Sequence, residues 1–147
     1  MRLNLAILLA MCGRFELENP EQIYGRFGTK NTFPEIRPNI NVAPSQMVPI
    51  VFGDGEVELT KWGLVPSWAK DPKIGYKMIN ARAEGIEVKP SFSKPFHTRR
   101  CIVPSTGFYE WKATENGKVP YIFQLKIMTC SGWPGYLMSG KINRVGK

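Results

Sequence analysis

Cys12 is a candidate nucleophile because it directly follows a second methionine, Met11. If translation starts at Met11 and that methionine is removed, Cys12 carries a free α-amine and a thiol on adjacent carbons. Both groups have ordinary pKa values near neutrality, at about 7.7–8.5, so both nucleophiles are partly available. The amine can condense with an aldehyde, and the thiol can close the imine into a five-membered thiazolidine. The alternative interpretation is a buried cysteine that packs as a small hydrophobe.

Glu110 is a candidate for proton transfer, since it stands between the large rings of Tyr109 and Trp111. If its side chain points inward, burial suits it to shuttle protons. If it points outward, it is a solvated charge on a strand. The spacing leaves both interpretations open.

Asn80 and Arg82 are two residues apart and would share a face if they lie on a strand. An amide and a guanidinium on one face can orient a phosphate or a sugar oxygen. A structural hydrogen bond to a loop is the alternative. The sole histidine, His97, has no partner spaced for a catalytic triad or a metal, so we expect a surface residue there.

Metal and nucleotide cofactors have no support in the sequence. The three cysteines at 12, 101 and 130 lack the CxxC or His-paired spacing of zinc sites, and no GxGxxG, Walker A or HExxH motif is present. The net charge of +8 and the isoelectric point near 9.6 favour a polyanionic partner, of which nucleic acid is the commonest. A generally basic surface without a dedicated partner is the alternative.

The elements that must position these residues are mostly strands. Short apolar or alternating runs, separated by turn signals at 53–55 and 116–117, predict strands over 48–52, 57–59, 101–104, 107–112 and 119–125. The segment 61–68 is predicted to continue as a strand and then to turn. A helix is predicted over 18–27, with Asn19 as its N-cap and Pro20 in its first turn. The Pro- and Asn-rich segment 33–49 is predicted to be a loop. No repeat or linker divides the chain, so we expect a single α+β domain that is mostly β.

Residues 1–10 form an apolar run that is too short to span a bilayer. We interpret them as a non-native or misassigned N-terminal extension, with an export signal as the alternative. The odd cysteine count fits a reducing compartment, so we expect a cytoplasmic protein without a membrane partner.

Five co-linear motifs resemble the SRAP family, the SOS-response-associated peptidases that shield abasic sites in single-stranded DNA. The motifs are Met-Cys-Gly-Arg-Phe at 11–15, Asn-Val-Ala-Pro at 41–44, Trp-Gly-Leu-Val-Pro-Ser-Trp at 62–68, Ile-Asn-Ala-Arg-Ala-Glu at 79–84 and Gly-Phe-Tyr-Glu-Trp-Lys at 107–112.

The resemblance implies a fold, a chemistry and a set of roles. Cys12 would form a thiazolidine with the ring-opened sugar aldehyde of an abasic site, Asn80 would position the linkage, and Glu110 would transfer protons. Arg14 and Arg82 would hold flanking phosphates, and Trp68 would pack near the DNA path. The peptidase label would correspond to self-removal of the residues ahead of Cys12. The resemblance also implies a bacterial monomer that needs no cofactor.

The family pattern extends beyond residue 125, whereas the tail of this chain diverges from it. We therefore interpret 11–126 as a partial SRAP domain that lacks C-terminal strands, and 127–147 as a divergent tail, for which a shifted reading frame is one interpretation. Degenerate codons of residues 132–147 permit a family-like strand in another frame. Three other functions stay open: a non-covalent single-stranded DNA-binding protein, a thiol peptidase acting on other proteins, and an inactive truncated product.

Overall fold

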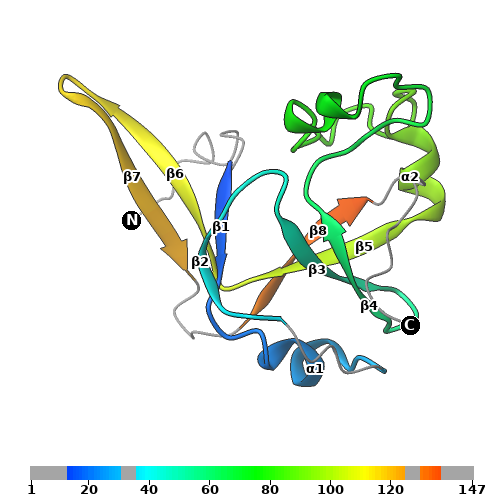
Figure 1. The fold of residues 1–147 in the computed structure, drawn as a ribbon, viewed down its shortest axis with the longest axis horizontal. Coiled ribbons are helices and arrows are strands. Elements are labelled where there is room, and N and C mark those ends of the chain that lie inside the picture. The colour runs from blue at the N-terminus through cyan, green and yellow to red at the C-terminus, as the bar shows by residue number, and fades with distance from the viewer. Residues whose placement is uncertain (1–12, 31–35, 125–129, 137–147) are drawn as a thin grey trace.

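The computed structural model describes residues 13–30, 36–124 and 130–136, which form two four-stranded antiparallel sheets and a few short helices (Figure 1). The first sheet has the spatial order β2 (Asn39–Val42), β1 (Arg14–Leu17), β6 (Gly107–Thr114) and β7 (Gly117–Gln124). The second has the order β4 (Val57–Lys61), β3 (Met47–Phe52), β5 (Arg100–Ser105) and β8 (Ser131–Tyr136). The predicted α+β class with mostly strands is confirmed.

The described helices are short: α1 (Gln22–Phe27), the 3₁₀ helix Pro72–Tyr76 and α2 (Ser93–Thr98). The predicted start of the first helix was wrong. Asn19 and Pro20 form a turn ahead of α1, in which the Gln22 N–H donates to the Asn19 carbonyl at 3.1 Å. The helix ends at Gly28, whose left-handed φ of 60° lets its N–H reach the Tyr24 carbonyl.

Two predicted hairpins are confirmed. The turn between β3 and β4 closes through the Gly55 N–H, which donates to the Phe52 carbonyl at 3.0 Å, and Gly55 has a φ of 86°. The turn between β6 and β7 has Gly117 at a φ of 114°, a conformation that glycine adopts without a Cβ penalty.

Two other predictions need correction. The segment predicted as a loop over 33–49 contains β2, which pairs with β1 through Phe15 and Val42. Its side chains are mostly exposed, so the sequence shows no apolar alternation there. The segment 61–68 was predicted to continue as a strand before turning, but the strand already ends at Lys61, and the predicted turn follows directly after it.

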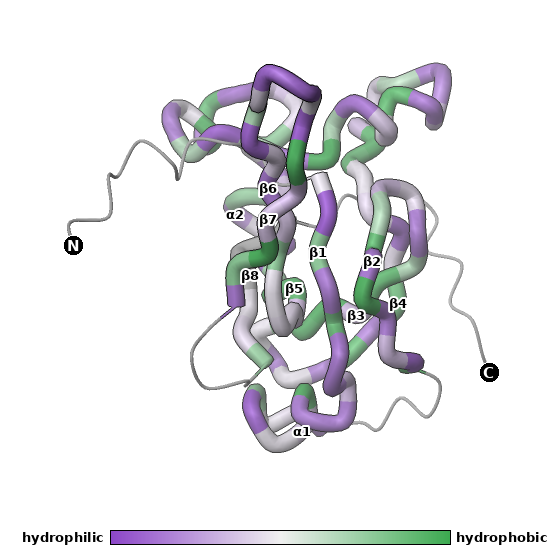
Figure 2. Tube along the Cα trace, turned by 90° about the vertical axis from the view of Figure 1, so that its left-hand side faces the viewer, coloured by the Kyte–Doolittle hydropathy of each residue, from purple (hydrophilic) through white to green (hydrophobic). Residues whose placement is uncertain are grey.

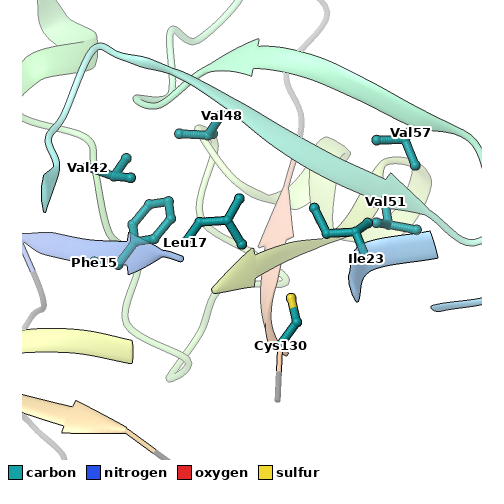
Figure 3. Packing of buried hydrophobic residues seen from close by; sticks show 8 residues of the cluster. All are labelled: Phe15, Leu17, Ile23, Val42, Val48, Val51, Val57 and Cys130. Carbon is teal, nitrogen blue, oxygen red and sulfur yellow. The ribbon is translucent and has the colours of Figure 1, made fainter. Parts of the chain in front are cut away.

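The hydrophobic core joins both sheets and α1. Phe15 and Leu17 of β1 lie near Val42 of β2 in Figure 3, and the cluster continues through Ile23, Val48, Val51, Val57 and Cys130. The chain crosses from the second sheet to the first at Thr106. There the Thr106 N–H donates to the Glu16 carbonyl at 2.8 Å, and the Thr106 hydroxyl accepts from the Glu18 N–H at 3.0 Å. These bonds fix where β6 begins relative to β1.

The start of β1 lies at the end of the molecule opposite α1. Figures 1 and 2, two views at right angles, both place the tip of the β6–β7 hairpin and the segment 62–92 at this end. This end therefore brings together the N-terminal side of β1 and the two segments that carry Glu110 and Asn80. In the part of the chain that the structure describes, no helix is long and apolar enough to cross a membrane.

The tail predicted to diverge from residue 127 contributes to the second sheet. Ser131–Tyr136 form β8, which pairs with β5 from Arg100 to Ser105. The Cys130 N–H donates to the Gln22 side chain of α1 at 3.0 Å. The remainder of the predicted tail lies outside the described residues, as does the predicted extension 1–10.

Candidate functional site

Cys12 lies outside the described residues, and the chain is described from Gly13, the residue that follows it. Gly13 leads directly into β1, so the geometry around β1 defines the surroundings of the candidate site. The neighbours of β1 are β2 on one side and β6 on the other.

The register of β1 against β6 brings Glu110 toward the start of β1. Arg14 pairs with Tyr109 and Phe15 pairs with Phe108. Because the two strands are antiparallel, the next position in this register places Gly13, just before β1, opposite Glu110 of β6. Because alternate residues share a face of a strand, Glu110 lies on the same face as Phe108 and Phe15, which is the face that packs on the core.

Glu110 carries a buried oxygen atom that has no hydrogen-bond partner among the described residues. Its side chain is half-buried, and its Oε1 atom is shielded from solvent yet accepts no hydrogen bond from the residues that the structure describes. Of the two orientations that the sequence left open, the structure therefore has the inward one. Buried acceptors are rarely left unsatisfied in folded proteins, and Thr29 Oγ1 and Glu58 Oε2 are the other described side-chain atoms in this state. Glu110 differs from these two because it lies beside the start of β1, which makes it the candidate for handling a ligand or a proton.

Asn80 lies in an irregular segment and not on a strand, so the premise that it shares a strand face with Arg82 was wrong. Two hydrogen bonds tie this segment to the chain after β4: the Leu64 N–H donates to the Met78 carbonyl at 2.9 Å, and the indole N–H of Trp62 donates to the Ile79 carbonyl at 3.0 Å. The Trp62 ring packs against Phe15. Asn80 is thus connected to the same face of β1 as Glu110.

Arg14 belongs to the opposite face of the sheet. Its Nη1 donates to Asn41 Oδ1 of β2 at 2.7 Å, which holds the guanidinium over the edge of the sheet. Beside it the Tyr109 hydroxyl donates to the Ile40 carbonyl at 2.7 Å. Burial raises the pKa of Tyr109, and the neighbouring Glu16 carboxylate adds to the increase. Arg14 and Glu110 therefore flank the start of β1 from two sides.

Trp68 and Arg82 are exposed residues of the segment 62–92, which also carries Asn80. The Trp68 side chain is 59% exposed, far more than a core tryptophan. An exposed ring of this kind offers a flat apolar surface to a base or a sugar. The structure thus connects Arg14, Asn80 and Glu110 through β1, and leaves Trp68 and Arg82 on the outer surface of the Asn80 segment.

Sequence reasoning missed Trp62 and Asn41 as residues of the site. Both fall inside the motifs given above. A tryptophan at the end of a strand is usually interpreted as a core residue, and an asparagine in a Pro-rich stretch as part of a turn. Their roles depend on contacts with residues 17 and 27 positions away. Spacing in the sequence carries no signal for either contact.

The remaining reactive side chains stand apart from this site. His97 is exposed at the end of α2, as predicted, and its ring meets Phe96 edge to face. Cys101 and Cys130 are buried, and burial raises the pKa of each thiol to about 11. Across 13–30, 36–124 and 130–136, no three His, Cys, Asp or Glu side chains are grouped as metal ligands.

The two-sheet fold and the match to a family model define the class of protein. The chain belongs to the SOS response associated peptidase (SRAP) family, whose model matches residues 11–136.

Individual relatives are described as abasic site processing proteins. The chain is 47% identical over 123 residues to the abasic site processing protein YoaM of Bacillus subtilis, a match that covers 79% of this chain and 54% of YoaM. It is 35% identical over 100 residues to the abasic site processing protein HMCES of Gallus gallus, covering 58% of this chain and 30% of that protein. The chain therefore spans about half the length of its bacterial relatives.

A solved structure supports the fold. A protein of Bacteroides thetaiotaomicron superposes with a TM-score of 0.74 at 29% identity, covering 85% of this chain and 59% of that one.

Proposed function

We propose that this chain captures abasic sites in single-stranded DNA by forming a thiazolidine with Cys12, once Cys12 is the N-terminal residue. Several relatives are described as abasic site processing proteins. The family match begins at Met11, directly ahead of Cys12.

The proposed chemistry balances without a cofactor. The α-amine of Cys12 adds to the aldehyde carbon of the ring-opened sugar and gives a carbinolamine. Loss of one water gives the imine. The thiol sulfur then adds to the imine carbon while its proton passes to the nitrogen, so the net products are a thiazolidine and one water.

The buried Oε1 of Glu110 is the observation that carries the proposal. Each step above moves a proton: off the sugar hydroxyl on ring opening, onto the leaving hydroxyl of the carbinolamine, and from sulfur to nitrogen on closure. A carboxyl group on the core-facing side of β6, near the start of β1, is suited to relay these protons. Its Oε1 atom accepts no hydrogen bond from the described residues, so it is open to a contact with the reacting groups.

The other predicted residues have roles that fit their surroundings. Asn80 would hold the sugar oxygen or the linkage through its amide. Arg14, on the other side of β1, and the exposed Arg82 would contact the flanking phosphates, and the net charge of +8 would favour the DNA backbone. Trp68 would stack beside the strand.

The same Cys12 supports a peptidase role. Hydrolysis of the Met11–Cys12 bond would consume one water, release residues 1–11 and free the α-amine. We propose that this self-removal is the peptidase activity, that it serves the SOS response to DNA damage, and that the protein acts as a cytoplasmic monomer. We also propose that the SRAP domain of this chain is partial. It was predicted over 11–126, and the family match and β8 extend it to residue 136.

The test uses a chain that starts at Cys12 and a single-stranded oligonucleotide with one abasic site. A denaturing gel should show a heat-stable shifted band. Three matched controls should lack it: Cys12→Ala, a chain with one alanine placed ahead of Cys12, and an oligonucleotide whose abasic residue is a tetrahydrofuran without an aldehyde. The alanine extension keeps the thiol and removes only the adjacent amine.

The outcomes separate the alternatives. A folded protein that gives no band in any form, yet binds DNA with a salt dependence unaffected by Cys12→Ala, is a non-covalent binder. A band that survives the alanine extension shows plain thiol addition. Failure to bind DNA at all identifies an inactive product.

A further inference from the structure

We propose that Trp62 is a positioning residue for the proposed reaction, which it serves by holding the Asn80 segment against β1. The inference rests on the proposed function, because it assigns Trp62 a role in the chemistry of Cys12. The proposal follows from three sets of contacts that Trp62 makes with separate parts of the chain.

The first contact fixes the peptide unit that contains the Asn80 nitrogen. The indole N–H of Trp62 donates to the Ile79 carbonyl at 3.0 Å in a partly buried setting. The Ile79 carbonyl carbon is bonded to the Asn80 nitrogen, and the peptide unit is planar. Holding the oxygen therefore holds the orientation of the bond that leads to the Asn80 Cα.

The second contact fixes the indole ring on β1. The ring centroids of Trp62 and Phe15 are 5.2 Å apart and the rings are inclined at 59°, a tilted arrangement that aromatic pairs favour. Phe15 is buried, and it pairs directly with Phe108, two residues before Glu110 on the same face of β6. Trp62 thus rests on the strand that leads from Cys12 and that also aligns Glu110.

The third set of contacts fixes the Trp62 backbone. Its N–H donates to the Gln46 carbonyl at 2.9 Å, and its carbonyl accepts from the Ser45 N–H at 2.8 Å. Ser45 adopts a φ of 74°, a left-handed conformation that costs energy in a residue with a side chain. The turn that receives Trp62 is therefore tightly specified.

The two residues after Trp62 also contact the segment that leads to Asn80. Gly63 has a φ of 133°, and a Cβ there would lie 2.5 Å from the Gly75 carbonyl oxygen. The N–H of the next residue, Leu64, donates a hydrogen bond to the Met78 carbonyl. The start of the 62–92 segment thus lies directly against 75–79, so a shift of Trp62 is transmitted to Asn80.

A buried indole N–H needs an acceptor, and the choice of acceptor decides what the tryptophan holds in place. Here the acceptor is the Ile79 carbonyl, in the irregular stretch that contains Asn80. Trp62→Phe retains a ring against Phe15 and removes that donor. We expect the Ile79–Asn80 peptide to lose its fixed orientation while the core stays packed.

The experiment measures the single-turnover rate of adduct formation on the abasic oligonucleotide. The chain starts at Cys12 and keeps every described residue, and its melting temperature is compared with that of the 1–147 chain. We expect Trp62→Phe to lower the rate at saturating DNA by about tenfold or more, and to leave the half-saturating DNA concentration unchanged. Tyr76→Phe is the matched control, since it removes one hydroxyl donor from an exposed ring of the same segment.

A double-mutant cycle separates positioning from general loss of structure. If Trp62 acts through Asn80, Trp62→Phe should cost little when added to Asn80→Ala. On the 1–147 chain, amide exchange over 77–84 should rise in Trp62→Phe and stay unchanged over the β6–β7 hairpin. Additive rates, or an unaltered rate in Trp62→Phe, overturn the inference alone. Absence of any wild-type adduct overturns the proposed function and this inference together.

Discussion

The Gln124 side chain donates from Nε2 to the Glu16 Oε1 atom at 2.6 Å, across the intervening strand β6. The two residues face each other through Gly107, which pairs with Glu16 on one side and with Gln124 on the other. Gly107 has no side chain to obstruct this bond. Glu16, a residue that is only 3% exposed, thereby links β7 to β1 through its side chain.

Gly107→Ala should therefore destabilise the protein. A Cβ at this position would lie 2.8 Å from Gln124 Cγ, 2.9 Å from Glu16 Oε1 and 2.9 Å from the Phe123 carbonyl oxygen. Overpacking of this kind costs about 1–3 kcal/mol, which urea denaturation would measure. Gly25→Ala is the control, because nothing lies within 4 Å of a Cβ there and an alanine in α1 should stabilise by about 0.5–1 kcal/mol. Equal free energies of unfolding for Gly107→Ala and Gly25→Ala would contradict the close contact of Gly107 with Glu16 and Gln124.

Gln124→Leu should also lower the free energy of unfolding. Leucine has a similar size but removes the 2.6 Å hydrogen bond that Gln124 donates to the buried Glu16 side chain, whose bond from the Thr106 hydroxyl is longer, at 3.4 Å. An unsatisfied buried acceptor costs about 1–3 kcal/mol, and more when it is charged. Val119→Ala, on an exposed position of the same strand, should change stability by less than about 0.5 kcal/mol. A wild-type melting temperature in Gln124→Leu would show that the bond contributes nothing.

The bond between Glu16 and Gln124 illustrates what the sequence could not supply. The strands β6 and β7 and their turn follow from alternation and from Asn116–Gly117, because a hairpin is a local structure. Glu16 and Gln124 are 108 residues apart. Nothing local identifies a glutamate inside a short strand as buried, and its partner depends on the order of strands in the sheet.

In the candidate site, too, local sequence identified candidate residues but not the tertiary contacts that place them. Residue types and the motifs that carry them led to Cys12, Glu110 and Asn80 as candidate residues, and the chemistry assigned to them stays a prediction. The strand premise for Asn80 failed because tertiary hydrogen bonds from Trp62 and Leu64 hold that segment in an irregular conformation. The inward orientation of Glu110 required the register of β1 against β6, which one step of slip would reverse.

Glu110→Gln should slow adduct formation while DNA binding persists. The amide keeps the size of the side chain but cannot exchange a proton at the buried Oε1 position. Loss of a positioned acid–base group lowers rates by about 10²–10⁴-fold. The measurement is the single-turnover rate of the gel-shifted adduct, with binding followed separately by fluorescence anisotropy on the tetrahydrofuran oligonucleotide. Glu84→Gln, at an exposed position of the 62–92 segment, serves as the charge-matched control. An undiminished rate in Glu110→Gln would remove Glu110 from the mechanism.

Gly63→Ala should disturb the Asn80 segment more than the rest of the fold. Its φ of 133° is unfavourable for alanine, and the new Cβ would lie 2.5 Å from the Gly75 carbonyl oxygen. Backbone atoms cannot move aside as a flexible side chain can, so we expect a loss of about 2 kcal/mol or more. Amide exchange should rise over 63–80 before it rises in β3 or β5. The control is Gly53→Ala, in a turn with open space around its Cβ. If amide exchange in Gly63→Ala rises no more over 63–80 than in the rest of the fold, as in Gly53→Ala, Gly63 and Gly75 are not in close contact.

The buried thiols should make stability fall in alkaline solution. Burial raises the pKa of Cys101 from 9.0 to about 11, so the folded chain keeps a proton that the unfolded chain has lost between these values. The unfolded state then binds fewer protons, and the free energy of unfolding decreases as pH rises. The contribution is complete below about pH 8.5 and should shrink by about 2 kcal/mol at pH 10.5. Urea midpoints at pH 8 and 10.5 would measure it, with Cys101→Val as the control that removes this thiol and keeps an apolar side chain. If the valine variant loses as much stability as the parent over this range, ionisation of Cys101 is not the cause.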